Sequence, residues 1–234
     1  MTNGQAASPT AGVIGEAIQL YRDHWRHLAS LALIVYLVVS LLSLVLTAAL
    51  SIVGVFLALV LSLIGVFWLQ GALIRAVEDI RDGRVDLSIG ETFAGVRPDL
   101  GRITGAGILA GLGIGVGILL LVVPGLYLIT IWSVLIPVIV LEGSGVGAAF
   151  GRSRTLVAGH GWNVFGVIIL SWLVLIVAGI VIGLITAPFG DAVGAFLADL
   201  ISGAITGPFV ALVLTLLYYR LRGREAAGGE PGLA

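Results

Sequence analysis

The chain has 234 residues, of which 59% are hydrophobic and only 11% are charged. A soluble domain carries roughly 25% charged residues, so this chain has too little polar surface to face water on all sides. The net charge of −1 argues against a nucleic-acid partner, and the absence of cysteine excludes disulfides, thiolate metal sites and a cysteine nucleophile. This composition predicts an integral membrane protein.

Three long apolar stretches are each too long for one membrane span. Residues 28–68 contain no charge and would make a helix of ~61 Å at ~1.5 Å per residue, about twice the ~30 Å hydrocarbon layer. We therefore expect a turn near residues 47–54. Residues 103–141 repeat this situation, with a turn expected at Pro124–Gly125 and a kink at Pro137.

The third stretch is expected to break at residues 187–191 and to kink at Pro208. The sequence thus predicts an all-α integral membrane protein with about six transmembrane helices arranged as three hairpins. The expected spans are residues 28–48, 52–70, 103–123, 125–141, 162–186 and 200–221. They form a single membrane domain over residues 11–222, with disordered tails expected at residues 1–10 and 223–234 and no signal peptide.

The distribution of arginine predicts the orientation. The chain has no lysine, and its arginines all fall before the first span, between the second and third, between the fourth and fifth, or at and beyond the end of the sixth. They are Arg22, Arg26, Arg75, Arg81, Arg84, Arg97, Arg102, Arg152, Arg154, Arg220, Arg222 and Arg224. The positive-inside rule then predicts a multi-pass protein of the plasma membrane with both termini in the cytoplasm.

The three segments that enter the hairpins share a spacing. In the first, Ile14-Gly15 is followed by Ile18 and Arg22; the second ends the same pattern at Arg97 and the third at Arg154. We interpret these as three repeated units, each a cytoplasmic amphipathic interfacial helix followed by a membrane hairpin. Such a helix lies in the headgroup layer with its arginines among the phosphates, so these three arginines are candidate lipid-headgroup residues.

Local signals place the ends of the interfacial helices. Ser88 and Glu91 have the spacing of a capping box, which predicts the start of the second helix, and Ser144 is expected to cap the third. Glu142 stands at the cytoplasmic end of the fourth span and is the fourth candidate interfacial residue. We expect its carboxylate to pair with Arg152 or Arg154.

No Asp, Glu, Lys, Arg or His lies in the middle of an expected span, which argues against a proton-coupled pump. Asp191 and Asp199 are expected on a surface helix at the exterior end, and a weak cation site is the alternative. Glu78 and Asp79 are adjacent in sequence and diverge on a helix, so they do not predict an acid–base pair.

His24 and His27 have a spacing that could hold a metal, but no third ligand is evident beyond Asp23 or the distant His160. Interfacial histidines beside phosphates are the preferred interpretation. We therefore predict no catalytic, cofactor or metal site. An intramembrane enzyme would require the three histidines and Glu142 to converge in space.

Glycine is frequent within the expected spans. Its spacing creates faces of small residues that allow close helix contact, at Gly107/Gly111, Gly111/Gly115, Gly113/Gly117, Gly179/Gly183 and Gly203/Gly207. Helix packing is the preferred interpretation of these pairs, and a span that lines a cavity is the alternative.

Several motifs in order are similar to one known family. They are Val123-Pro124-Gly125-Leu126-Tyr127, Leu141-Glu142-Gly143, residues 148–159 and Leu217-Tyr218-Tyr219-Arg220-Leu221-Arg222. Over residues 14–222 the chain resembles the membrane domain of glycerophosphoryl diester phosphodiesterases, a family of six-span bacterial membrane proteins. Arg220 departs from the pattern, which leads us to expect an acid there. Some members join this domain to a soluble hydrolytic barrel, for which this chain has no room, so the resemblance does not imply the enzymatic activity.

Together these observations predict a non-enzymatic integral membrane component that organises or recruits lipid or a partner protein at the cytoplasmic membrane. A transporter or lipid-translocating protein is the alternative, favoured by the kinked, glycine-rich spans and the internal repeat. Membrane lipids are the expected partners beside a protein partner still to be identified, and no cofactor or nucleic acid is expected.

Overall fold

The computed structural model describes residues 12–82 and 88–228, and these ranges contain helices and no strand. The elements are α1 (Val13–Arg81), α2 (Ile89–Val96), η1 (Arg97–Asp99), α3 (Leu100–Leu120), α4 (Val122–Ile131), α5 (Leu135–Glu142), α6 (Val146–Val157), α7 (Gly161–Thr186), η2 (Ala187–Phe189) and α8 (Asp191–Gly228). The predicted all-α class is confirmed.

Five helical stretches are long and apolar enough to cross a membrane: Val13–Arg81, Ile89–Leu120, Val122–Glu142, Gly161–Phe189 and Val193–Ala226. In the first and the fourth, only 11% of the most apolar window is buried inside the protein. Large apolar side chains therefore point outward, among them Leu119 at 87% and Ile52 at 82% exposure. Exposing so extensive an apolar surface to water costs much free energy, whereas exposing it to lipid does not. The chain is therefore an integral membrane protein.

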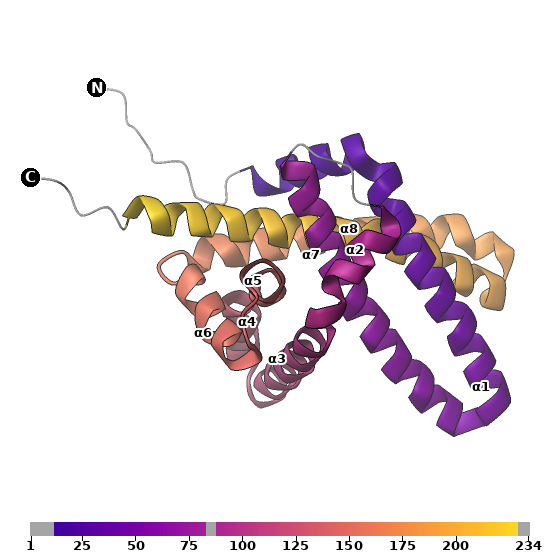
Figure 1. The fold of residues 1–234 in the computed structure, drawn as a ribbon. Coiled ribbons are helices and arrows are strands. Elements are labelled where there is room, and N and C mark those ends of the chain that lie inside the picture. Colours follow the sequence, from indigo (N-terminus) through magenta and orange to yellow (C-terminus); the bar gives the residue numbers. More distant parts are fainter. Residues whose placement is uncertain (1–11, 83–87, 229–234) are drawn as a thin grey trace, which may run out of the picture.

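α1 is folded back on itself into a hairpin (Figure 1). The reversal occurs at Ser51, whose φ of 47° and ψ of −124° are not helical. Three residues later the chain passes so close to the preceding turn that a Cβ on Gly54 would lie 1.9 Å from the carbonyl oxygen of Leu46, and only glycine fits there. The turn predicted near residues 47–54 is confirmed. We call residues 28–50 the first arm and residues 52–81 the second arm.

The second reversal differs from its prediction. α3 ends at Leu120, and Leu121 is extended with φ −158° and ψ 134° before α4 begins. The chain thus turns three residues before Pro124, which lies in the first turn of α4. A proline is tolerated there because the first amides of a helix have no intrahelical acceptor to lose. Gly125 then packs against α3, where its Cα lies 3.0 Å from the position of a Cβ on Gly117.

The fourth predicted span is interrupted near Pro137, as expected. α4 ends at Ile131, and α5 restarts at Leu135 with Pro137 in its first turn. The third hairpin reverses through η2 and Gly190, whose φ is 80°, so the break predicted at residues 187–191 is also confirmed.

α8 is longer than predicted at both ends. It contains 38 residues, which corresponds to a length of ~57 Å at ~1.5 Å per residue. It begins at Asp191, before the span expected from residue 200, and it remains helical to Gly228 where a disordered tail was predicted from residue 223.

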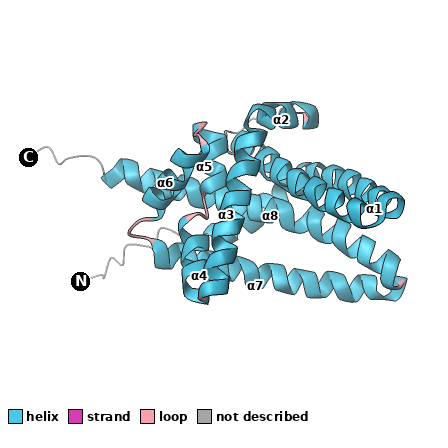
Figure 2. Cartoon of the chain, turned by 90° about the horizontal axis from the view of Figure 1, so that it is seen from below, coloured by secondary structure: helices cyan, strands magenta, loops and turns pink. Residues whose placement is uncertain are grey.

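α8 lies between the α1 hairpin and α7 (Figure 2), and it packs against both. The part of α8 around residues 211–218 is deeply buried, and its fully buried side chains include Leu212, Leu216, Leu217 and Tyr218. One core cluster joins α8 to α1 through Leu28, and the other joins it to α3, α5 and α6. α8 is therefore the central helix on which the remaining hairpins are assembled.

Two of the short helices, α2 and α6, each pack a phenylalanine against a tryptophan of the protein. Phe93 of α2 meets Trp68 edge-on at 5.3 Å, and Phe150 of α6 meets Trp132 edge-on at 4.9 Å. Both phenylalanines occupy the same position of the predicted repeat, where the first unit has Ile18, which is 48% exposed. These two phenylalanines thus each cover a tryptophan of the protein.

One of the two helix-capping predictions is confirmed and the other is wrong. Ser88 and Glu91 form the predicted capping box at the start of α2, with both reciprocal hydrogen bonds present. The prediction for the third helix is wrong, because α6 takes Gly145 as its N-cap with no side-chain cap, so the hydroxyl of Ser144 stands one residue too early.

Candidate functional site

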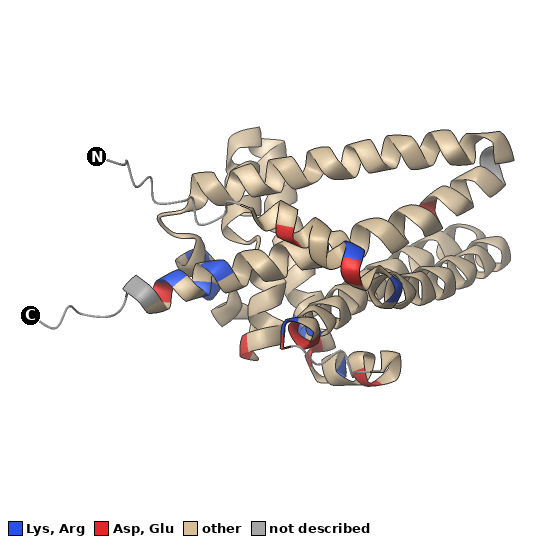
Figure 3. Ribbon diagram, turned by 90° about the horizontal axis from the view of Figure 1, so that it is seen from above, with Lys and Arg blue, Asp and Glu red and all other residues tan. Residues whose placement is uncertain are grey.

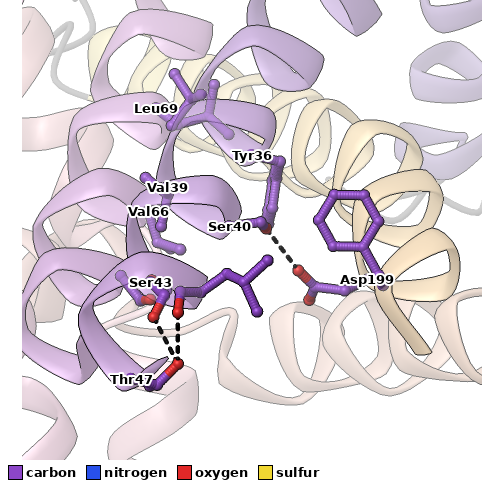
Figure 4. Close-up of a pocket in the computed structure, with 12 residues that line it drawn as sticks. Tyr36, Val39, Ser40, Ser43, Thr47, Val66, Leu69 and Asp199 are labelled. Carbon is purple, nitrogen blue, oxygen red and sulfur yellow. Dashed lines mark hydrogen bonds between the residues drawn. The ribbon is translucent and has the colours of Figure 1, made fainter. Parts of the chain in front are cut away.

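A cavity of about 520 Å³ lies between the two arms of α1 and the first turns of α8 (Figure 4). We call it the groove. Its lining consists of Val35, Tyr36, Val39, Ser40, Ser43, Leu44, Thr47, Ser62, Val66, Leu69, Phe196 and Asp199. Apolar side chains form its walls, and hydroxyl groups and one carboxylate form its polar part. The first arm supplies most of the hydroxyls.

The hydroxyl-bearing side chains of the first arm form a stripe. Tyr36, Ser40, Ser43 and Thr47 follow one another at steps of four, three and four residues, which places all of them on one face of a helix. The second arm adds Ser62 from the opposite wall. We call the four first-arm residues the hydroxyl stripe. The sequence analysis missed it, although its helical spacing within an uncharged span was a readable signal.

Asp199 of α8 faces the hydroxyl stripe. The Oγ of Ser40 donates a hydrogen bond of 3.1 Å to the Oδ2 of Asp199, although the two residues are 159 positions apart. Ser40 precedes the turn at Ser51 by eleven residues, which is ~16 Å of helix. This is about half of the ~30 Å hydrocarbon layer. Asp199 therefore lies beside the middle of the first arm.

One prediction about acidic residues is corrected by this position. Asp199 does not belong to a separate surface helix, because α8 starts at Asp191 and holds Asp199 two turns inside. The prediction that no charged residue lies in the middle of a span is not contradicted, because Asp199 lies near the start of the apolar stretch Val193–Ala226. Its carboxylate nevertheless faces the middle of the first arm, which belongs to another helix.

Two hydroxyl groups of the stripe, those of Thr47 and Ser43, differ in their hydrogen bonds. Thr47 Oγ1 donates to the carbonyl oxygens of Ser43 and Leu44, at 2.9 and 3.0 Å. The Oγ of Ser43 is buried and has no hydrogen-bond partner within residues 12–82 and 88–228. A buried polar atom without a partner costs free energy, so this hydroxyl is a group that a bound species would satisfy.

Glycine allows Tyr36 to reach the groove. A Cβ on Gly203 would lie 2.4 Å from the ring of Tyr36, so α8 presents a flat surface to this ring. The close contact predicted for Gly203 is confirmed. By contrast, Gly179 and Gly183 have no atom within 4 Å of such a Cβ among the described residues, so the packing contact predicted for this pair is wrong within the chain.

The predicted glycine face of α3 is confirmed in part. A Cβ on Gly107 would lie 2.2 Å from the ring of Phe67, and one on Gly113 would lie 2.9 Å from Trp132. Gly111 and Gly115 face open space within the part of the chain that the structure describes. Of these four glycines, only Gly107 and Gly113 therefore lie against a large aromatic side chain.

A second polar region lies where the helices meet, and long parts of the hairpins carry no charge (Figure 3). Its centre is Arg152, whose Nε donates to the carboxylate of Glu142 at 3.1 and 3.2 Å. The other two nitrogens of Arg152 donate to Glu225 at 2.6 and 2.7 Å. Tyr218 Oη adds a hydrogen bond of 2.9 Å to Glu142. The predicted pairing of Glu142 with Arg152 is confirmed, and this carboxylate is not left free for a lipid headgroup.

The two carboxylates hold the pKa of Arg152 above its ordinary value, with the hydrogen bonds to Glu225 as the larger cause and those to Glu142 as the second. The guanidinium is thus charged at every physiological pH. Because Glu142 ends α5 and Glu225 is near the end of α8, the ion pairs of Arg152 connect three helices.

Other arginines also contact the protein. Arg220 of α8 pairs with Glu16 in the first turn of α1, Arg102 donates to the carbonyl oxygen of Gly143 at 2.6 Å, and the guanidinium of Arg81 lies 3.9 Å from the centre of the Tyr219 ring. These contacts link the start of α1 and the second arm to α8, and α3 to the end of α5. Together with Arg152 and its partners, we call these groups the charged layer.

Three arginines behave differently. Arg22, Arg97 and Arg154 are exposed, and their side chains make no hydrogen bond, ion pair or ring contact with the residues that the structure describes. They are the arginines of the predicted repeat. The structure therefore leaves these three candidate headgroup residues accessible, while the fourth candidate, Glu142, is paired.

The histidines do not converge on a site. His24 Nδ1 lies 3.3 Å from the carbonyl oxygen of Leu20, and His160 Nδ1 lies 3.2 Å from that of Ala158. Among the described residues no group of three His, Cys, Asp or Glu side chains could hold a metal. Glu78 pairs with Arg75 at 3.0 Å. The structure thus does not assemble the cluster that an intramembrane enzyme would require.

No family model and no solved structure matches the chain. The resemblance to the phosphodiesterase membrane domain stays a prediction. The chain is similar to the Na(+)/H(+) antiporter NhaA of Gluconobacter oxydans (strain 621H), with 35% identity over 109 residues. This match covers 44% of the chain and 26% of the antiporter, so the chain spans about a quarter of the length of the curated relative it matches.

Proposed function

We propose that the chain is a membrane transport protein in which the groove between the α1 hairpin and α8 is the path of a small polar solute. The observation that carries this proposal is the hydroxyl stripe facing Asp199 beside the middle of an apolar helix. A carboxylate at membrane depth is costly, and such groups are usually retained because a solute or proton uses them. A protein that only filled the bilayer would have apolar side chains at these positions.

The proposed topology follows from the hairpins. If each arm of α1 crosses separately, the chain crosses the bilayer six times and both termini lie on one side. The charged layer then lies at the cytoplasmic surface, where arginine is enriched in membrane proteins. This places the open end of the α1 hairpin in the cytoplasm and its turn at Ser51 on the opposite side.

The likeness to an Na(+)/H(+) antiporter is compatible with transport. It covers a limited part of either protein, so the groove, and not the likeness, is the main support. The transporter alternative is thereby favoured over the purely structural role that composition suggested. The resemblance to the phosphodiesterase membrane domain remains consistent with the proposed six spans.

The test is solute flux into proteoliposomes that contain the purified full-length chain. Protons, Na⁺, K⁺ and glycerol are followed separately, and each rate is compared with protein-free vesicles and with Asp199→Asn. We expect at least one solute to move faster with the wild-type chain and to lose most of this increment with Asp199→Asn. Asp23→Asn removes an exposed carboxylate of α1 outside the groove and should match the wild type. Equal rates in all four preparations would overturn the proposal.

A second candidate function has its own observation. Arg22, Arg97 and Arg154 are exposed and have no partner among the described residues. They favour a component that organises anionic lipid at the cytoplasmic surface, since guanidinium binds phosphate through a bidentate fork. We expect native mass spectrometry of the chain in phosphatidylglycerol micelles to show retained lipid. The triple change of these arginines to Gln should reduce it severalfold, and equal retention would exclude this role.

A further inference from the structure

The groove presents one carboxylate and five hydroxyl groups to a solute, and no positive charge. Asp199 is the only charged side chain among the lining residues that the structure describes, and the hydroxyl stripe and Ser62 are the other polar ones. An anionic solute would be repelled by this carboxylate and would find no counter-charge. A purely apolar solute would leave the carboxylate and the hydroxyl of Ser43 without partners. The groove therefore suits a polar solute that is not an anion.

The carboxylate of Asp199 is accessible to water. The residue is exposed, and Ser40 Oγ donates to its Oδ2 at 3.1 Å. A carboxylate accepts about four hydrogen bonds, so most of its lone pairs are open to further donors. The hydroxyl groups of a neutral solute can replace waters at these positions with no change of charge. A neutral solute also brings no charge of its own into the apolar layer, where an ion is costly.

We propose that the solute of the groove is a neutral polyol, a compound with hydroxyl groups on neighbouring carbon atoms. The proposal rests on the transport function of the groove and specifies the class of its solute. Two neighbouring hydroxyls donate to the carboxylate of Asp199, and a further hydroxyl meets the unpartnered Oγ of Ser43. A hydroxyl both donates and accepts, so it can use the hydrogen and the lone pairs of Ser43. A cation offers no acceptor and would leave this hydrogen unused.

The rest of the groove suits the carbon skeleton of such a compound. Val39, Val66 and Phe196 line it, and the C–H edges of a polyol can pack against them. Its volume of about 520 Å³ falls within the ~300–1,000 Å³ of sites for small organic molecules, so several carbons and their waters fit. Thr47 follows Ser43 one turn along the first arm, where its Oγ1 can still accept a hydrogen bond. The hydroxyl stripe thus offers successive contacts along one wall.

Protection of a single thiol measures binding of the polyol. The chain has no cysteine, so Ser62→Cys introduces one thiol on the wall opposite the hydroxyl stripe. The purified full-length variant is alkylated with a maleimide in detergent, with erythritol, 1,4-butanediol or choline chloride at equal concentration. We expect erythritol to slow alkylation. The butanediol has as many carbons but no neighbouring hydroxyls, so it should need a concentration at least about threefold higher. Choline should not protect.

Variants of the groove separate its contributions. In the Ser62→Cys chain, Ser43→Ala should raise the half-protecting erythritol concentration about two- to tenfold, which corresponds to one lost hydrogen bond. Asp199→Asn keeps an acceptor oxygen without the charge and should raise it about three- to tenfold, whereas Asp199→Leu should abolish protection. Asp23→Cys in the otherwise unchanged chain places an exposed thiol outside the groove, and its alkylation should be equal in all three solutes. Gel filtration confirms that each variant is folded.

Three outcomes would overturn the proposal. They are no protection by erythritol, equal protection by 1,4-butanediol, or stronger protection by choline, which would identify a cation site instead. A thiol at position 62 that does not react at all would show a groove closed to water and would overturn it as well. The binding and flux experiments fail independently. Flux of another solute without protection by erythritol would preserve the transport function and remove the polyol, whereas protection without flux would do the reverse.

Discussion

Arg152 on α6 and Glu225 near the end of α8 form a two-pronged ion pair, with nitrogen–oxygen distances of 2.6 and 2.7 Å across 73 positions of sequence. The same guanidinium also binds Glu142, so its loss would leave two carboxylates side by side. The geometry makes this arginine the main polar connection between the middle and the end of the chain.

We therefore predict that Arg152→Gln lowers the free energy of unfolding by about 1–2 kcal/mol, a modest cost because the groups are partly exposed. Arg154→Gln is the matched control, since this exposed arginine has no partner among the described residues and should change stability by less than about 0.5 kcal/mol. Thermal unfolding in detergent measures both. Equal costs for the two variants would show that the ion pair does not stabilise the fold.

The effect of Arg152→Gln should be the same at pH 6 and pH 8. The pKa of Arg152 is raised in the folded state, so its contribution is fully present below the pKa of the unfolded chain and is lost only as pH rises through the folded pKa. Both experimental values lie far below this window for arginine. A cost that differed between them would indicate a neighbouring group that titrates near neutrality.

The turn of the α1 hairpin offers a substitution that is expected to stabilise the protein. Ser51 adopts a φ of 47° with a ψ of −124°, a conformation that glycine adopts without strain. Ser51→Gly should stabilise the hairpin by up to about 1 kcal/mol, and Ser51→Val should destabilise it by a similar or larger amount. Urea or SDS unfolding distinguishes the two. Destabilisation by Ser51→Gly would mean that the turn has another geometry in the membrane.

The contact between α8 and Tyr36 makes a third position testable. A methyl group at residue 203 would overlap the Tyr36 ring, so Gly203→Ala should cost about 1–3 kcal/mol and displace this ring within the groove. Gly179→Ala, which meets no atom within 4 Å in the described chain, should be neutral or slightly stabilising as a helix substitution. Chemical unfolding measures the cost of each substitution, and crosslinking between α1 and α8 reports whether the two helices move apart.

The ion pair between Glu16 and Arg220 connects the start of α1 to α8. We expect Glu16→Gln to increase hydrogen–deuterium exchange in residues 13–23 severalfold, because this short segment precedes the non-helical His24 and fewer contacts then hold it. Asp23→Asn changes an exposed acid of the same segment and should leave the exchange unchanged. No increase for Glu16→Gln would show that the apolar contacts of Val13 and Ala17 suffice.

Local signals predicted much of the fold. Hydropathy and chain length required a reversal near residues 47–54, and the capping box at Ser88 and the breaks near Pro137 and residues 187–191 depend only on neighbouring residues. The predicted position of the second reversal, at Pro124–Gly125, was wrong because Pro124 was interpreted as a helix breaker. Proline is also frequent in the first turn of a helix, which is where Pro124 lies.

The groove could not be derived from the same signals. Its central hydrogen bond joins Ser40 to Asp199 across 159 positions, and no periodicity within one segment predicts which helices become neighbours. The hydroxyl stripe itself was readable from spacing. Its functional meaning required the position of the carboxylate, which depends on α8 being longer than its apolar run.

α8 carries the groove carboxylate near one end and the ion-paired Arg220 and Glu225 near the other. The 26 residues from Asp199 to Glu225 correspond to a rod of ~39 Å. A displacement of this rod at the groove would also move the ion-paired side chains at its other end, and Pro208 marks the point at which the helix can bend instead. One helix thus connects the groove mechanically to the ion pairs of Arg152 and Glu16.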